Sequence, residues 1–166
     1  QRGHECHLLT VQPGEVEGVT VHDIRSISTP KPLHYALSLL KVKSILKKIN
    51  PDILNTHFLT GYGYWGHFSG MHPNVLTVWG DDVYVTPYEN SLKRKLAEIA
   101  MKSCDALTGD STDILEQSVR DLGADPVRSF RVLWGVDFSV FKPVDANNWR
   151  TDLGFSEEDI VYFSPR

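Results

Sequence analysis

Residues 76–87 read LTVWGDDVYVTP, an apolar run that breaks into a glycine and two adjacent carboxylates. An apolar run of this length indicates a buried strand. The segment Gly80-Asp81-Asp82 is typical of the turn that leaves such a strand. The fold class then depends on which elements lie before and after this strand and its turn.

Short apolar runs with the length of strands recur along the chain. They occupy residues 6–11, 19–24, 53–55, 75–79, 106–108, 130–133 and 160–163. Helical patterns separate several of these runs. Because alternation of strands and helices is typical of a parallel sheet, the sequence predicts an α/β fold with a Rossmann-like, doubly wound parallel sheet.

Two of the predicted helices have a clear apolar stripe. The first runs over residues 33–49 and stops before Pro51, since proline lacks an N–H and clashes with the preceding turn. The second contains Leu92, Leu96 and Ile99 on one face. Lys93, Arg94 and Lys95 lie beside that stripe, which indicates a solvated face or, as the alternative, contact with an anionic membrane surface.

The composition is that of an ordinary globular domain. The 166 residues are 41% hydrophobic and 23% charged, so the chain can bury one substantial core. A formal net charge of −4 disfavours a nucleic acid partner. Cys6 and Cys104 belong to no closely spaced motif, and we expect two half-buried thiols in a reducing compartment. The sequence has no signal-peptide pattern and no apolar run of roughly 20 residues, which predicts a cytoplasmic protein.

In a sheet of this kind, ligands bind where loops leave the carboxyl ends of the strands. The loop at residues 56–63 contains His57, which can exchange a proton, and Gly61, which allows close approach of a ligand. A histidine that only completes the strand end is the alternative reading. Another loop, at residues 108–111, exposes N–H groups that could hold an anion, although plain helix capping is the favoured reading of this loop by itself.

The acidic pair of the opening stretch is the third candidate. Asp81 and Asp82 carry the oxygen ligands that Mg²⁺ prefers. Adjacent residues on an extended chain point to opposite sides, so we expect one of the two to accept hydrogen bonds in the turn. The sequence therefore predicts no metal site. The chain also lacks the sequence motifs of dinucleotide-binding, P-loop and α/β-hydrolase proteins.

A third helix is predicted over residues 114–122. Its N-cap is Asp110 or Ser111, because a short polar side chain there can accept a hydrogen bond from the first turn. Gly123 is the expected C-terminal stop, because glycine adopts the left-handed conformation without strain.

Four segments recur in an order that resembles a known family. They are PDILNTH at 51–57, LTVWGDDV at 76–83, CDALT at 104–108 with Ser111, and LWGVD at 133–137 with FKP at 141–143. Together they resemble the N-terminal domain of family 4 (group 1) glycosyltransferases of the GT-B fold, over nearly the whole chain. The resemblance implies one half of a GT-B fold, truncated at both ends.

The resemblance implies two parts in the chain. Residues 1–143 would form the acceptor-side Rossmann-like domain, lacking its first strand and glycine-rich loop, and residues 144–166 would begin the nucleotide-sugar-binding domain. Gly135 and Asp137 fall at the interdomain hinge of the family. Arg166 falls where the family has an arginine near the donor diphosphate, whose oxygens suit a guanidinium fork.

The activity of the family implies that the complete protein is a glycosyltransferase of the hexosyltransferase type, in polysaccharide or glycoconjugate biosynthesis. It would move a sugar from a nucleotide-sugar donor to a hydroxyl of a carbohydrate or lipid-linked acceptor, with retention of anomeric configuration. The resemblance implies no metal requirement and no cofactor. These 166 residues alone would be inactive, because the donor site would lie in the other half.

The same resemblance implies the site residues. The catalytic set is His57, Trp79 and Asp81. The substrate-binding set is Gly61, Tyr62, Gly80, Asp110 and Ser111. Trp79 stands where family members often have a histidine, and it offers a stacking face and one N–H donor but no titrating proton.

Two functions of other classes remain open. One is a GT-B-like epimerase that acts on the nucleotide-sugar itself without an acceptor. The other is a non-catalytic carbohydrate-binding module, for which Trp79 in place of a histidine is the supporting feature. Analysis of the product separates the first from a transferase, and binding without turnover identifies the second.

Overall fold

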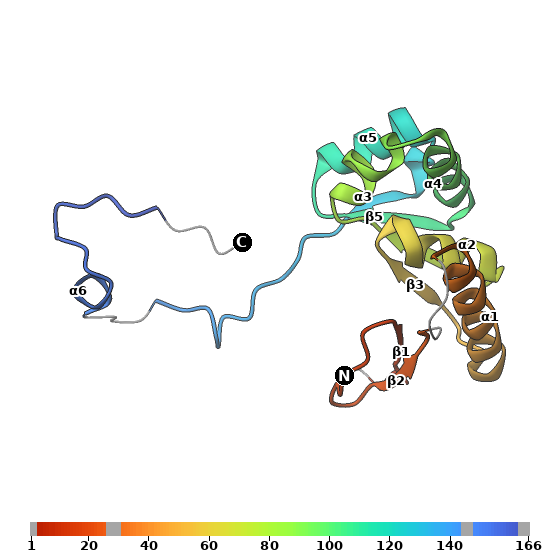
Figure 1. Ribbon diagram of the computed structural model, residues 1–166, viewed down its shortest axis with the longest axis horizontal. Coiled ribbons are helices and arrows are strands. Elements are labelled where there is room, and N and C mark those ends of the chain that lie inside the picture. Colours follow the sequence, from red (N-terminus) through yellow and green to blue (C-terminus); the bar gives the residue numbers. More distant parts are fainter. Residues whose placement is uncertain (1–2, 26–30, 144–147, 163–166) are drawn as a thin grey trace. The chain divides into compact units, whose positions relative to one another are not determined.

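The computed structural model describes residues 3–25, 31–143 and 148–162, with the side chains of 31–33 left aside (Figure 1). The chain forms two compact units, Gln1–Leu133 and Trp134–Arg166. In the described part of the second unit the one helix is α6 (Trp149–Asp152), where Trp149 packs edge-on against Phe155. The candidate site belongs to the first unit.

The first unit contains two parallel sheets. The strands are β1 (His7–Thr10), β2 (Thr20–Asp23), β3 (Leu54–His57), β4 (Asn74–Thr77), β5 (Ala106–Gly109) and β6 (Ser129–Arg131). β1 pairs with β2, and the other four form a sheet in the order β3-β4-β5-β6. Every pairing between them is parallel. The predicted α/β class with parallel strands is confirmed, and the arrangement is that of a Rossmann-like half of a GT-B fold.

Helical segments connect the strands. They are α1 (Lys31–Ile49), η1 (Leu59–Gly63), α2 (Tyr64–Ser69), α3 (Asp81–Tyr84), η2 (Thr86–Tyr88), α4 (Ser91–Ser103), α5 (Thr112–Leu122) and η3 (Pro126–Arg128). Helix α1 ends at Ile49, before Pro51, as the sequence predicts. Helices α1 and α2 contact each other, and α4 contacts both α2 and α5.

The capping of α5 resolves the alternative that the sequence leaves open. Ser111, rather than Asp110, is the N-cap, and its hydroxyl accepts a hydrogen bond from the Ile114 N–H at 3.3 Å. Gly123 ends the helix with φ of 75°, a left-handed conformation that glycine adopts without strain. Both ends of α5 therefore follow from local rules of capping.

Two apolar clusters form the interior of the first unit. The larger one packs the inner faces of α4 and α5 against β4 and β5, through Leu76, Val78, Ala97, Met101, Leu107, Ile114 and Leu122 among others. The smaller one joins Ile24, Val42, Leu46 and Trp65, and it lies between the β1-β2 sheet, α1 and α2. Trp65 is fixed there because its indole N–H donates to the Tyr35 carbonyl at 3.1 Å.

Three expectations differ from the structure. Residues 160–162 form no strand, and Phe163 lies outside the described residues. Ile160 and Tyr162 are 81% and 92% exposed, and none of the strands in the described residues pairs with this segment. The cysteines are not alike: Cys6 is exposed and Cys104 is buried, where desolvation raises the pKa of its thiol to about 11. Helix α2 was not expected.

No helix in the described ranges is long and apolar enough to cross a lipid bilayer. Two of the three basic residues on α4 are engaged by neighbours. Lys93 pairs with Glu89, and Arg94 donates to Glu98 at 3.1 Å and to the Asp121 carbonyl at 2.8 Å. Membrane contact by this helix stays a prediction.

Candidate active site

The loops after β3 and β4 leave the sheet side by side. Because His57 is opposite Thr77 in the ladder, the residue that ends β3 lies next to the residue that ends β4. Trp79 follows Thr77 by two positions, in the loop after β4. Its ring centroid is 5.8 Å from that of His57, and the two ring planes are inclined at 57°. The structure thus brings together two of the predicted catalytic residues.

The two rings differ in their surroundings. Desolvation lowers the pKa of His57 below the ordinary value of 6.5. The imidazole is therefore neutral at pH 7, with one nitrogen able to donate and the other able to accept. Trp79 is 51% exposed, so a large part of its indole is open to solvent. An aromatic face beside a neutral imidazole can hold a sugar ring and a hydroxyl at the same time.

Asp82 connects the two loops. Its side chain is fully buried, and its carboxylate accepts three backbone hydrogen bonds. Oδ1 accepts from the N–H groups of Trp79 at 3.0 Å and Gly80 at 2.8 Å, and Oδ2 accepts from the Leu59 N–H at 2.7 Å. The expectation that one of the two aspartates serves the turn is confirmed. The other, Asp81, is exposed and begins α3.

Gly80 makes the turn between β4 and α3. Its φ of 144° and ψ of −90° lie in a region that residues with a Cβ rarely adopt. The surrounding space is open, because a Cβ built on Gly80 would meet no atom within 4 Å. Glycine is therefore needed for the backbone conformation rather than to let another group approach.

We expect Gly80→Ala to lower the free energy of unfolding by about 2 kcal/mol, the cost of holding an alanine in this conformation. Urea denaturation of the variant beside the wild type measures it. Gly14→Ala is the matched control, since Gly14 has open space and no positive φ. Equal losses in the two variants would show that the turn relaxes without strain.

The loop after β3 has its own irregular backbone. Phe58 has φ of 77°, and Gly61 has φ of 86° and ψ of −87°. These two residues turn the chain so that Leu59 is buried and α2 starts at Tyr64. Tyr62, predicted to bind substrate, has its hydroxyl near the end of β1, where it accepts from the Val11 N–H at 3.2 Å.

The predicted loop at residues 108–111, with Asp110 and Ser111, follows β5. Ser111 caps α5, so its hydroxyl is used within the fold. A contact links α5, which follows this loop, to α3, which follows β4: the Tyr84 hydroxyl donates to the Asp113 carboxylate at 2.6 Å. Burial and this carboxylate raise the pKa of Tyr84. The substrate-binding role of Asp110 and Ser111 stays a prediction.

A row of polar side chains crosses the strands just before the site, and the sequence did not point to it. The Thr77 hydroxyl donates to Asn55 Oδ1 at 3.0 Å and lies 2.8 Å from the Thr108 hydroxyl. The three residues come from β3, β4 and β5, one each. In the sequence, the only sign of this row is a polar residue near the end of each apolar run. Which of these side chains meet depends on the register of strand pairing, which the sequence does not show.

The remaining predicted residues lie in the second unit. Gly135 and Asp137 come just after the first unit ends at Leu133. Asp137 accepts hydrogen bonds from the Ser139 hydroxyl and N–H, which lower the pKa of its carboxyl. Arg166 lies outside the described residues. The roles of these three as hinge and diphosphate contacts stay predictions.

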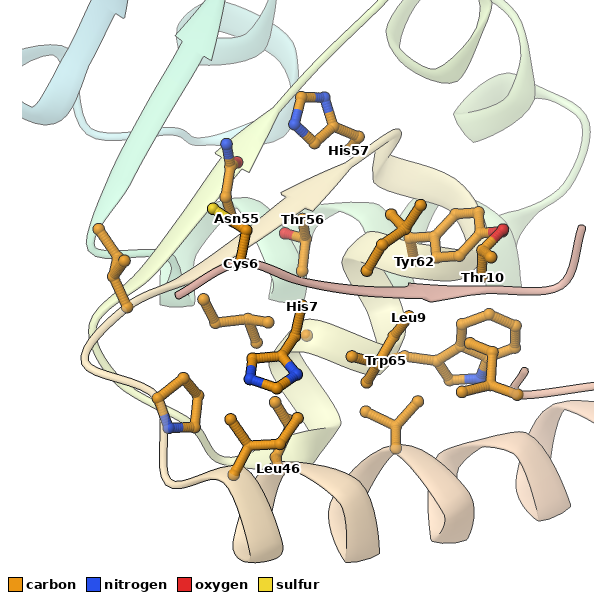
Figure 2. Close-up of a pocket in the computed structure, with 18 of the residues that line it drawn as sticks. Cys6, His7, Leu9, Thr10, Leu46, Asn55, Thr56, His57, Tyr62 and Trp65 are labelled. Carbon is orange, nitrogen blue, oxygen red and sulfur yellow. The ribbon is translucent and has the colours of Figure 1, made fainter. Parts of the chain in front are cut away.

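His57 also lines a cavity of about 850 Å³, which Figure 2 shows. It is lined from β1 by residues such as His7 and Leu9, from α1 by Leu46, and from β3 by Asn55 and His57. Across the described residues, no group of three or more histidines, cysteines, aspartates or glutamates is placed to hold a metal ion. The residues at hand are suited to hydrogen bonding and stacking.

Residues 1–111 match a family model described as "Glycosyl transferase 4-like". No curated protein matches the chain. The matched span includes the loops after β3 and β4 and ends at Ser111, so His57, Trp79 and Asp82 all lie within it.

Proposed function

Since the chain belongs to the glycosyl transferase 4-like family, we propose that the protein transfers a glycosyl unit from a nucleotide-sugar to an acceptor hydroxyl, with retention of configuration. In that reaction the bond from the anomeric carbon to the diphosphate oxygen breaks and a bond to the acceptor oxygen forms. The hydroxyl proton goes to the departing diphosphate or to solvent. The family supports transfer of a glycosyl group; donor, acceptor and stereochemistry are parts of the proposal.

The observation that carries the proposal is the pairing of His57 and Trp79 at adjacent strand ends within the matched span. Carboxyl ends of parallel strands are where α/β proteins bind their ligands. The indole face of Trp79 packs against the apolar face of a sugar ring. The neutral His57 imidazole positions a hydroxyl of the acceptor or of the transferred sugar.

Asp82 keeps this pair in place. Because its carboxylate bonds to the N–H groups of both Leu59 and Trp79, the loop after His57 and the turn at Trp79 share one buried anchor. Preorganised groups lose less freedom when a substrate binds and reacts. We assign stabilisation of the departing diphosphate to positive groups of the donor side, including Arg166, and completion of the site to closure about Gly135 and Asp137.

The test is a screen of nucleotide-sugars with the whole protein. Nucleoside diphosphate release is measured with and without mono- and oligosaccharide and lipid-linked acceptors, and NMR of the product gives the anomeric configuration. Release that depends on an acceptor, with the configuration of the donor kept, supports the proposal. Inverted product overturns the retaining part.

Two outcomes would replace the proposal. Conversion of a nucleotide-sugar into an isomer without release of nucleoside diphosphate identifies an epimerase. Binding of a nucleotide-sugar or saccharide by titration calorimetry, without turnover of any donor, identifies a carbohydrate-binding module.

A further inference from the structure

Helix α3 follows the turn that carries Trp79, and it consists of a single helical turn. It runs from Asp81 to Tyr84 and contacts α5, η1 and η2 (Figure 1). A helix of four residues is too short to be stable alone, so contacts with its neighbours must fix its position. Trp79 comes two residues before α3, and its indole is half-exposed. The contacts that hold α3 therefore decide where this exposed ring lies.

The inner side of α3 is fixed by buried residues. Val83 belongs to the larger apolar cluster. The Asp82 carboxylate accepts three backbone hydrogen bonds, one from the loop after β3 and two from the turn after β4. Asp82 thus joins α3 to the loop after β3 and to its own turn, and none of its three hydrogen bonds reaches α5.

The outer side of α3 is joined to α5 by Tyr84. Its side chain is 38% exposed, and its hydroxyl donates to the Asp113 carboxylate at 2.6 Å. Its backbone N–H donates at 2.8 Å to the carbonyl of Gly80, the residue directly after Trp79. A hydrogen bond to a carboxylate is about twice as strong as one between neutral groups. Tyr84 therefore connects the turn after β4 firmly with the first turn of α5.

The surroundings of the Tyr84 hydroxyl belong to the loop after β5. Burial raises the pKa of Tyr84 above its ordinary value of 10.0, and the hydrogen bond to Asp113 and the charge of this residue raise it further. A hydrogen bond with Ser111 acts in the opposite direction, and the charge of Asp110 adds to the increase. The phenol is therefore protonated, and a donor, at neutral pH. Trp79 and the loop with Asp110 and Ser111 are all predicted to contact the substrate, and Tyr84 links the elements that carry them.

A second bond of the same kind lies elsewhere on α5. The Tyr88 hydroxyl in η2 donates to the Asp121 carboxylate at 3.2 Å, and both tyrosine bonds are exposed. Helix α5 begins after β5 and leads to the start of the parallel strand β6, so its first turn is at the carboxyl edge of the sheet and its last turn at the amino edge. Only the bond of Tyr84 is therefore at the edge that carries His57 and Trp79.

We propose that Tyr84 is a positioning residue for the sugar substrate. Its bond to Asp113 fixes α3 against the start of α5, and thereby holds the indole of Trp79 in place for the sugar ring. This role rests on the proposed function, since it concerns the binding of a sugar at Trp79. Tyr84 acts through Trp79 and takes no part in the chemical step. An exposed hydrogen bond adds little to the stability of the fold, so its loss is expected to act on substrate binding.

The test compares Tyr84→Phe with Tyr88→Phe in the whole protein, because each variant removes one hydroxyl that bonds to a carboxylate of α5. In Tyr84→Phe, we expect KM to rise about fivefold for the sugar substrate that Trp79→Ala also affects, with kcat nearly unchanged, as the loss of one hydrogen bond allows. In Tyr88→Phe, we expect KM to stay as in the wild type. Asp113→Asn keeps an acceptor oxygen and is expected to keep most of the affinity.

A double-mutant cycle separates positioning from a general loss of stability. If Tyr84 acts through Trp79, Tyr84→Phe raises KM no further once Trp79→Ala is present. Additive effects of the two substitutions would overturn the proposal. Equal effects of Tyr84→Phe and Tyr88→Phe would overturn it too, because a merely structural bond does not depend on its distance from the site.

A measurement without substrate distinguishes failure of this proposal from failure of the proposed function. The indole N–H of Trp79 gives one NMR signal, which its loss in Trp79→Phe assigns. We expect this signal to shift in Tyr84→Phe and to stay in place in Tyr88→Phe. An unshifted signal in Tyr84→Phe overturns the positioning role, whether or not the protein transfers sugars. A shifted signal in a protein that turns over no donor overturns the proposed function, and it supports the part of Tyr84 in holding Trp79.

Discussion

Asp82→Ala is expected to lower the free energy of unfolding by about 3–5 kcal/mol, the largest effect of any single substitution proposed for this chain. The carboxylate is fully buried and accepts hydrogen bonds from the N–H groups of Leu59, Trp79 and Gly80. Alanine leaves the three donors without this acceptor, and the bond from Leu59 is buried while those from Trp79 and Gly80 are partly buried. Each unsatisfied buried donor costs about 1–3 kcal/mol, and partial relaxation of the loops recovers some of the sum.

The measurement is urea denaturation of Asp82→Ala beside Asp81→Ala. The two variants remove the same side chain from adjacent positions, but Asp81 is exposed. A surface substitution of this kind changes stability by about 0.5 kcal/mol or less. Asp82→Asn keeps the shape and one acceptor oxygen, so we expect an intermediate loss. Similar losses for Asp81→Ala and Asp82→Ala would contradict the role given to Asp82.

His57→Ala is expected to lower kcat/KM for glycosyl transfer by about 100-fold, which is what the loss of correct substrate positioning can cost. The reason is that its neutral imidazole, with a lowered pKa, is the titratable group beside the exposed face of Trp79. Steady-state kinetics with the donor and acceptor found in the screen measure the effect. His72→Ala is the control, because His72 precedes β4 and lies at the opposite end of the strands.

Substitutions of Trp79 test the same site in two steps, removal of the ring and its replacement by a smaller one. Trp79→Ala removes the stacking face, and we expect kcat/KM to fall about tenfold, which corresponds to the roughly 1.4 kcal/mol of an aromatic contact. Trp79→Phe keeps a ring and is expected to recover most of the loss. Phe68→Ala removes an exposed aromatic residue of α2 and serves as the control. Unchanged kinetics in both His57→Ala and Trp79→Ala would remove this site from the reaction.

Much of the fold could be predicted because local rules decide it. Ser111 and Gly123 mark the ends of α5 through capping chemistry, and Pro51 follows the end of α1. The apolar runs located the six strands to within a few residues. Parallel pairing followed from alternation with helices.

Other parts depend on contacts that the sequence does not show. Helix α2 was missed because Gly61, Gly63 and Gly66 make that region resemble a loop. Gly66 is helical and close-packed: a Cβ there would lie 2.4 Å from Thr56 Cγ2, so glycine serves the packing of α2 on β3. For the acidic pair, alternation predicted that one of the two aspartates accepts hydrogen bonds in the turn. That it is Asp82 depends on the position of Leu59, in the loop after β3, whose N–H donates to it.

The three hydrogen bonds of Asp82 also bear on how this chain tolerates exchange of its two loops. The loop after β3 and the turn after β4 share one anchor, so an insertion in either displaces the other. Exchange of one loop alone should therefore give an unstable hybrid, while exchange of residues 58–82 as a block replaces the anchor together with both of its partners. In natural recombination and in laboratory shuffling, these residues would then have to be inherited together for the hybrid to be stable.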